Sequence, residues 1–571
     1  MKPKPKTYHC PMFATPVKTM RSEAATSTAI EARSSIRSGD PTIVAACFEV
    51  KHQLHIRGVV HPYEEVTDAS TDPISAESPV QDGRVEDVTR LLSGAAIVAA
   101  AYLGVLSVGD LDNRRGLLAA LILPLWVICL ATTRWVTRDN ASLRRPVITV
   151  AMLALAVQLP GLFSPPASSS DAWRYVWDGR VQLSGASPYS YVPLDDRLGG
   201  LRDPILFPGL ASGQRSGVTT TPLPADRDEL LRRARSDPRT VINRPQVPTI
   251  YPPAAQVWFA AVAAVTPWSA GTLGIQVGSA LLAVAVAAAL AAWLQRRGRN
   301  PREALWWAWC PTVILEAGNG GHVDVLGAAL VLSAVITLTT SRPGRAASTV
   351  FAGLLLGAAA AVKLTPLAIL PAFMPLRHNR AGHSEVSFSG AGSSRLRHAW
   401  QVPLVAVGTL FASYLPHVPI AGGLVLGYLP GYLSEEGGVN RGGVLRLVVP
   451  DGLLTPAILL VMGIVALWAV SSTRVEAPQH AALVIFGSLL LVTTPSYPWY
   501  SLPLVALAVM SRRLEWLAVA VAGYVAYAGT RVPPVSAVGY AVAAVVVIGV
   551  ALWRRRQARS SPRAAAGTSR K

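Results

Sequence analysis

The sequence has few charged residues for its length. Only 15% of the 571 residues are charged and 51% are hydrophobic, whereas soluble domains usually contain about 25% charged residues. This balance excludes an ordinary soluble domain and indicates a membrane protein. Cysteine is scarce as well, and the four cysteines have no metal-like spacing. We therefore expect neither a zinc site nor a disulfide framework.

Acidic residues are especially scarce. The chain has 33 Asp and Glu against 52 Lys and Arg, a net charge of +19. Such an excess could indicate a nucleic-acid partner, but the basic residues lie in short loops between apolar segments and in the tail, residues 554–571. This distribution follows the positive-inside rule. We therefore expect no nucleic-acid partner and a cytoplasmic tail that contacts anionic lipid.

Residues 1–88 lack a sustained apolar pattern. They are rich in Ser, Thr, Pro and charge, and the start MKPKPKTYHCPMF has no apolar core of the kind found in signal peptides. This composition predicts a flexible cytoplasmic N-terminal extension.

Apolar runs recur from residue 92 to residue 553, and many are long enough to cross a hydrocarbon core of about 30 Å as a helix. Backbone groups in lipid must be satisfied within the chain, so these segments are expected to be helical. The predicted fold is an all-α polytopic membrane protein, a bundle of about 12–14 transmembrane helices within residues 89–553. The expected spans are 92–109, 115–133, 146–163, 272–294, 303–318, 323–340, 347–361, 364–376, 400–419, 453–471, 480–494, 499–511, 514–529 and 535–553.

The short basic loops, such as RWVTRDNASLRR at 134–145, are assigned to the cytoplasm. Fourteen crossings then place both termini in the cytoplasm and the loops 164–253 and 420–452 outside. This parity requires that the apolar segment 254–268 does not cross fully, and we expect a partly inserted or interfacial helix there. The spans 347–361 and 364–376 could also form one kinked element.

Polar residues gather on the predicted outer face. The first outer loop begins with DAWRYVWDGRVQLSGASPYSY and closes with NRPQVPTIYPPAAQ, and the runs LEAGNGGHVDVLGAAL, AAVKLTPL and TTPSYPWYSLP add others. Ionisable residues at membrane depth are costly and usually face a cavity or one another, so we expect one outward-facing polar site. The candidate binding residues are Arg174, Tyr175, Arg180, Tyr189, Tyr251, His322, Asp324, Lys363, Trp499 and Tyr500.

Each of these residues also has a structural explanation. Ser170 or Asp171 could cap a helix, and Arg174 could simply pair with an aspartate on a solvated surface. Lys363 could extend its amine toward the membrane surface. Tryptophans at this level are typical of an interfacial belt, and Glu435 is interpreted as an ordinary loop charge.

These residue types suit transfer of a group from a phosphate-linked donor. Cations such as Lys363 and His322 would stabilise the charge that develops on the leaving phosphate, and Asp171 or Asp178 would accept the proton of an acceptor hydroxyl. Aromatic rings beside polar groups suit a sugar, which has apolar faces and a rim of hydroxyls.

The pattern D-x-x-R-Y-x-W-D-G-R-V-Q-x-x-G-x-x-P-Y, followed by T-I-Y-P-P, resembles the polytopic GT-C glycosyltransferases. It is similar to glycosyltransferase family 87 and to the bacterial polyprenyl-phosphate-mannose-dependent mannosyltransferases. The likeness covers about residues 92–553 and implies transfer of a hexose, with mannose favoured, from a polyprenyl-phosphate donor. The acceptor would be a glycolipid or polysaccharide of the cell envelope, on the extracytoplasmic face of the cell membrane.

The same resemblance makes Asp171 the base, because an acidic residue of the first large loop has this role in such enzymes. The turn G-H-V-D, which contains His322 and Asp324, is similar to a turn in related mannosyltransferases. Many GT-C enzymes have two adjacent acidic residues at the loop start, whereas serines precede Asp171 here. Either Asp178 complements Asp171 or one base suffices, and we expect no metal or other cofactor.

The alternative class is a transporter or a flippase of lipid-linked sugars, which also uses many helices and intramembrane charge. Transporters place their site near the midplane between repeats, and we find no internal repeat in the sequence. A structural or assembly protein would need no polar cluster. The clustering at one face favours an enzyme.

Overall fold

The computed structural model describes residues 79–138, 143–341, 346–374, 391–436, 442–472, 477–530 and 533–560. Within these ranges the regular elements are helices and no β-strand is present, apart from one isolated bridge between Asp195 and Val218. The predicted all-α fold is confirmed. Most of the predicted N-terminal extension, residues 1–78, and the end of the tail, residues 561–571, lie outside the described residues.

Within these described ranges, seven helices are long and apolar enough to cross a membrane. The apolar stretches of α4 and α12 continue beyond these helices into short helical turns, to Phe163 and Leu433. The seven are α2 (Pro79–Leu106), α3 (Arg115–Thr137), α4 (Pro146–Gln158), α8 (Leu273–Arg296), α12 (Ala391–Tyr414), α15 (Asp451–Ser472) and α19 (Pro533–Ser560).

The other predicted spans correspond to shorter helices. A π-helix, η7 (Val313–Asn319), and α10 (Asp324–Thr340) form one apolar pair bent by 114°. The remaining short apolar helices are α7 (Pro253–Val265), α11 (Ala346–Val362), α16 (Pro478–Thr493), α17 (Leu502–Ser511) and α18 (Leu517–Ala528). Every residue of α17 is buried, so protein rather than lipid surrounds it, and such a helix does not need the length of a full span.

The structure corrects three boundaries. Helix α2 begins at Pro79, within the predicted flexible extension, and Asp87 in its third turn forms a buried ion pair with Arg302 that joins the helix to the bundle. Helix α19 continues to Ser560, within the predicted tail, and Arg554 pairs there with Glu515. The predicted span 364–376 is instead a 3-10 helix, Thr365–Phe373, with one proline in its first turn and another inside it.

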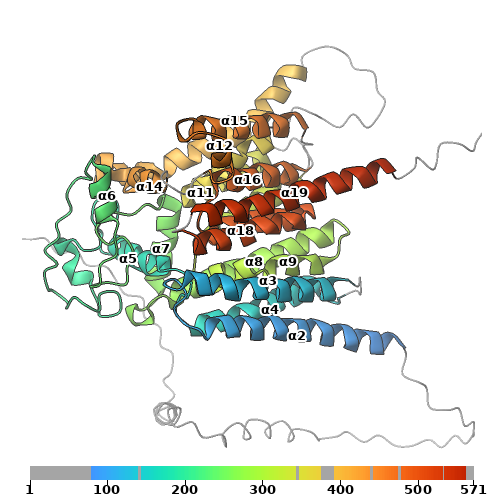
Figure 1. The fold of residues 1–571 in the computed structure, drawn as a ribbon, viewed down its shortest axis with the longest axis horizontal. Helices are drawn as coiled ribbons and strands as arrows, with labels where there is room; N and C mark the ends of the chain where they lie inside the picture. The colour runs from blue at the N-terminus through green and yellow to red at the C-terminus, as the bar shows by residue number, and fades with distance from the viewer. Residues whose placement is uncertain are drawn as a thin grey trace, which may run out of the picture. The chain divides into compact units, whose positions relative to one another are not determined.

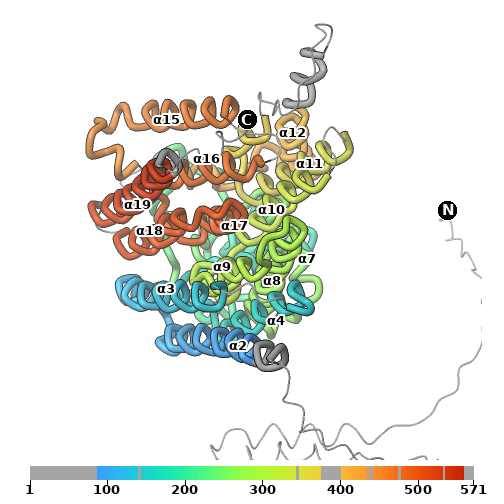
Figure 2. The backbone as a smooth tube through the Cα atoms, turned by 90° about the vertical axis from the view of Figure 1, so that its right-hand side faces the viewer, coloured from blue at the N-terminus to red at the C-terminus, as the bar shows by residue number. Residues whose placement is uncertain are grey.

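The long helices run side by side, and α5 (Asp171–Leu183), α6 (Arg227–Arg233), α7 and α14 (Leu429–Glu436) gather at one end of them (Figure 1). Seen along the bundle, α18 lies between α3 and α19 (Figure 2). The segment between α4 and α7 is the large loop expected from the sequence, and it contains α5 and α6.

Helices α5 and α7 cross closely at Gly179. A Cβ atom at this position would lie 2.4 Å from the carbonyl oxygen of Phe259, so a larger residue would push the two helices apart. The ring of Tyr175 stacks on Phe259 with 4.4 Å between centroids. Pro253 occupies the first turn of α7, where its missing N–H costs nothing. This packing fixes the start of α5 relative to the T-I-Y-P-P segment.

Candidate active site

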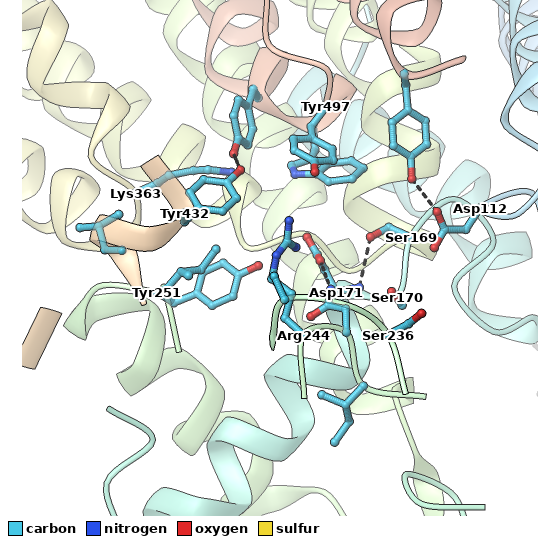
Figure 3. Close-up of a pocket in the computed structure, with 18 of the residues that line it drawn as sticks. Asp112, Ser169, Ser170, Asp171, Ser236, Arg244, Tyr251, Lys363, Tyr432 and Tyr497 are labelled. Atoms are coloured by element: carbon cyan, nitrogen blue, oxygen red, sulfur yellow. Dashed lines mark hydrogen bonds between the residues drawn. The ribbon is translucent and has the colours of Figure 1, made fainter. Parts of the chain in front are cut away.

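A cavity of about 440 Å³ lies at the end of the bundle where α5, α6 and α14 gather. Its wall comes from segments far apart in sequence, including the start of α5, the loop before α7, the end of α11 and the segment before α17. Five of the predicted site residues line it: Asp171, Tyr251, Lys363, Trp499 and Tyr500. The first three of these are labelled in Figure 3.

Asp171 is the first residue of α5, and its carboxylate faces this cavity (Figure 3). The N-cap is Ser170, so Asp171 is not occupied as a cap. Its Oδ1 atom accepts a hydrogen bond from Asn243 Nδ2 at 2.5 Å. Its position in the first turn places the carboxylate near the N-terminal, positive end of the helix dipole.

A buried row of ionisable side chains extends from Asp171 into the bundle. The Nδ1 atom of His322 lies 3.6 Å from Asp171 Oδ2, and Nε2 lies 3.3 Å from Glu316 Oε2. Glu316 also accepts hydrogen bonds from Tyr524 and Ser168, at 2.7 and 2.9 Å. His322 is fully buried, and its ring lies between the carboxylates of Asp171 and Glu316.

The ring of His322 stacks on Trp499, with 3.7 Å between the ring centroids. Glu316 lies in the π-helix η7. Short π-helical turns are frequent at functional sites. The sequence placed Glu316 on the outer face but did not identify it as a site residue. An acidic residue within an apolar segment was the signal available.

Lys363 follows α11 and projects toward the cavity (Figure 3). Its Nζ atom donates to Asp324 Oδ1 at 2.8 Å and lies 3.5 Å from the ring centroid of Tyr500. Asp324, which begins α10, is buried. The two predicted residues of this turn therefore have different neighbours. His322 lies beside Asp171, and Asp324 pairs with Lys363.

Arg244 is a cation of the cavity wall that the sequence analysis missed. Its side chain extends beside Asp171 toward Tyr497 (Figure 3). The backbone of Arg244 has φ of 47°, a left-handed conformation that is uncommon for residues other than glycine. Its position depends on this loop conformation, which has no simple signature in the sequence.

Glu435 of α14 pairs with Arg244 at 3.0 Å and is largely buried, so its interpretation as an ordinary loop charge is wrong. Burial lowers the pKa of Arg244, but Tyr497 and the Glu435 carboxylate raise it, and the net pKa lies above the usual value. Arg244 is therefore fully charged at neutral pH.

Arg115, at the start of α3, adds a further cation to the wall. It donates to Asp112 at 2.9 Å and lies over the ring of Tyr527 at 4.2 Å. The cavity thus combines three cationic side chains with the carboxylates of Asp112 and Asp171. Such a set can hold a phosphate while leaving a carboxylate available for a hydroxyl.

Asp178, the second predicted acid, does not line this cavity. It is buried and accepts hydrogen bonds from Arg174 Nε at 2.8 Å and from Thr249 Oγ1 at 2.6 Å. The guanidinium of Arg174 also donates to the carbonyl oxygens of Arg244 and Val247. This pair ties the first motif to the T-I-Y-P-P segment and holds the loop that carries Arg244.

Three further predicted residues do not line the cavity. Arg180 forms an ion pair with Asp203 and lies 4.7 Å from the ring of Trp268. The hydroxyl of Tyr189 donates to the carbonyl of Tyr251 at 2.9 Å. Tyr175 is buried against Phe259, as described above. In the described part of the chain, no group of three or more His, Cys, Asp or Glu residues is placed to hold a metal ion.

The fold and the cavity define a membrane protein with a polar site at one end of its helices. The model of glycosyltransferase family 87 matches residues 249–495, from T-I-Y-P-P to the segment before Trp499. The match confirms the resemblance to family 87 over this region and supports a membrane glycosyltransferase. The matched range contains His322 and Lys363, whereas Asp171 precedes it. No curated protein and no solved structure gives a significant match to the chain.

Proposed function

We propose that the protein transfers a hexose, with mannose as the first candidate, from a polyprenyl-phosphate sugar to a glycan or glycolipid acceptor on the extracytoplasmic face of the cell membrane. The observation that carries this proposal is the cavity in which the Asp171 carboxylate faces the same space as Arg244 and Lys363. A base and a phosphate site within one cavity are the two requirements of such a transfer.

The reaction is a single displacement. The acceptor oxygen attacks the anomeric carbon of the donor, the carbon–oxygen bond to the phosphate breaks, and polyprenyl phosphate leaves with the bonding electrons. The proton of the acceptor hydroxyl passes to Asp171. Arg244, Lys363 and Arg115 stabilise the negative charge on the departing phosphate, and attack opposite the leaving group inverts the anomeric centre.

His322 and Glu316 position the base. His322 contacts Asp171 on the side opposite Asn243, so the carboxylate is held between two polar groups with a limited choice of rotamers. Held in this way, Asp171 loses little entropy when an acceptor hydroxyl approaches.

Aromatic side chains form the sugar-binding wall in this proposal. Tyr497 stacks near Trp499 with 4.9 Å between centroids, and both line the cavity. Rings of this kind contact the apolar faces of a sugar while charged groups contact its hydroxyls.

A transporter or flippase of lipid-linked sugars is the competing function. Transporter sites lie near the bilayer midplane, whereas this cavity lies at one end of the helices, beside α5 and α14. Uptake of labelled sugar by proteoliposomes, compared with transfer from a panel of polyprenyl-phosphate sugars, separates the two functions. Uptake without transfer would refute the enzyme proposal.

The decisive variant is Asp171→Asn. Because Asp171 is not a cap, this change should leave the fold intact while removing the proton acceptor. Loss of a general base reduces transfer by on the order of a hundred- to ten-thousand-fold. Donor binding should remain.

Asp112→Asn is the matched control within the same cavity. Asp112 already accepts from Tyr527 and Arg115, so it is committed to the wall, and we expect a loss of less than about tenfold. Transfer by Asp171→Asn within about threefold of wild type would show that Asp171 is not the base.

A further inference from the structure

A second polar cavity lies at the opposite end of the bundle. It has a volume of about 260 Å³, and four arginines and one glutamate line it: Arg134, Arg138, Arg512, Arg554 and Glu303. An adjoining cavity of about 570 Å³ shares Glu303 and Arg512 and adds Arg299 and Arg302. We call the smaller cavity the basic pocket. Nothing in the proposed transfer reaction uses it.

Helix α3 shows how far the basic pocket lies from the active-site cavity. Arg115 lines the active-site cavity and Arg134, on the same helix, lines the basic pocket. The rise between them is about 28 Å at 1.5 Å per residue, close to the hydrocarbon thickness of about 30 Å. Helix α18 also extends from one cavity to the other. Leu514, just before α18, lines the basic pocket, and Tyr527, near the end of α18, lines the active-site cavity. The basic pocket therefore lies at the headgroup level of the other leaflet.

The basic pocket has an excess of positive charge. Glu303 is shared between Arg512, at 3.1 Å, and Arg299, at 2.6 Å. Within the part of the chain that the structure describes, neither Arg134 nor Arg138 forms an ion pair. These two residues lie four positions apart on α3, so their like charges repel one another unless an anion lies between them.

The backbone of Arg512 supports a dedicated site. Arg512 ends α17 with φ of 52°, in the left-handed region. Glycine is the usual residue at such a helix end, because a side chain there carries a conformational cost. An arginine at this position presents its guanidinium between the two cavities, which a glycine would not provide.

Tryptophans mark this end of the bundle as a membrane interface. Trp135 and Trp553 are 41% and 56% exposed and adjoin Arg134 and Arg554 in the sequence, and Trp306 lines the pocket itself. Such residues are typical of the headgroup level. Toward the middle of the bundle, α3 and α19 expose apolar side chains such as Val127 and Ile548, which suit acyl chains.

We propose that the basic pocket binds the phosphate of an anionic phospholipid in the leaflet opposite the active-site cavity. The arginines hold the phosphodiester, and the exposed apolar faces of α3 and α19 contact the acyl chains. Basic pockets between transmembrane helices bind anionic headgroups by the same physics. A free phosphate anion has the same headgroup chemistry, so the test must distinguish the two.

The test measures ligand binding by the purified full-length protein in neutral detergent. Short-chain phosphatidylglycerol, short-chain phosphatidylcholine and inorganic phosphate are titrated separately, and the rise in melting temperature gives an apparent Kd for each. We expect saturable binding of phosphatidylglycerol alone. Binding of inorganic phosphate with equal affinity would overturn the lipid assignment.

The variant R134Q/R138Q removes two of the pocket charges, and R144Q/R145Q is its matched control. Arg144 and Arg145 are exposed at the start of α4 and do not line the basic pocket. Loss of charge-assisted contacts should weaken phosphatidylglycerol binding by about tenfold or more in the first variant. The control should stay within about twofold of wild type. Equal weakening in both variants would mean diffuse attraction to the surface and would refute the pocket.

The single variant R138Q guards against misfolding of the double variant. Arg138 caps the end of α3 and is exposed, so its replacement should not disturb packing. We expect weaker binding in the same direction, by severalfold. Unchanged phosphatidylglycerol affinity in a folded R138Q protein would overturn the proposal.

Discussion

Asp178 offers a direct test of whether the second acid of the motif acts in structure or in catalysis. It is 1% exposed, and its two carboxylate oxygens accept hydrogen bonds from Arg174, Thr249 and Gln256. Asp178→Asn keeps the shape but replaces one acceptor oxygen with a donor. The guanidinium of Arg174 then remains buried with only neutral partners, including the carbonyls of Arg244 and Val247.

Removing one partner of a buried ion pair typically costs about 3–5 kcal/mol, because the remaining charge is uncompensated. We expect Asp178→Asn to lower the free energy of unfolding by that amount. Transfer per folded molecule should fall by less than about tenfold, since Asp178 acts on the cavity only through the loop that Arg174 holds. Unfolding in a denaturant series, with transfer measured on the folded fraction, gives both quantities.

A double-mutant cycle with Arg174→Met sharpens this test. Arg174→Met leaves the Asp178 charge buried and removes the donors to two backbone carbonyls. The double variant buries no charge, so its cost should be clearly smaller than the sum of the two single costs. A stable Asp178→Asn protein that loses transfer a hundredfold or more would refute the structural assignment and make Asp178 a catalytic acid.

Three further predictions concern the cavity, the helix crossing and the orientation. Lys363→Gln should raise the KM for the donor by about tenfold or more, whereas Arg180→Gln should leave it unchanged, because Arg180 pairs with Asp203 away from the cavity; equal effects on KM would contradict this division. Gly179→Ala should destabilise the protein by about 1–3 kcal/mol through its clash with Phe259, while Gly408→Ala, which meets open space on α12, should not, as unfolding curves will show. In a background without Cys10 and Cys47, Ser212→Cys should react with an impermeant thiol reagent on intact cells and Arg296→Cys should not; the reverse pattern would invert the proposed orientation.

The roles of Asp171 and Asp178 show where sequence reasoning reached its limit. The two residues are seven positions apart on α5, about two turns, so they share a helix face and helix periodicity alone does not separate their roles. Their separation along the axis is about 10 Å. That distance carries Asp178 away from the cavity and under the T-I-Y-P-P segment, where Thr249 and Gln256 bind it. Only the fold of the returning loop decides which acid faces the cavity.

The sequence analysis named Arg180 as a binding residue and missed Arg244, whereas Arg244 lines the cavity and Arg180 does not. Arg180 lies in the last turn of α5 and Arg244 lies in the loop before α7, and neither sequence position by itself tells which arginine reaches the cavity. Arg244 reaches the cavity because its backbone takes a left-handed conformation and Glu435 of α14 holds its side chain, 191 positions away. Arg180 points to Asp203 instead. Contacts of such sequence separation are set by tertiary packing.

The sequence alone determined the membrane class, the all-α fold and the concentration of polar residues near the ends of particular apolar segments. These properties follow from hydropathy, which is local and adds up along the chain, and from the requirement that backbone groups in lipid pair within helices. Tertiary structure decided which of those polar residues share one cavity, that Glu316 lies behind His322, and that arginines at the far end form a second pocket. These arrangements depend on the direction and depth of each side chain, which the packing of distant helices sets.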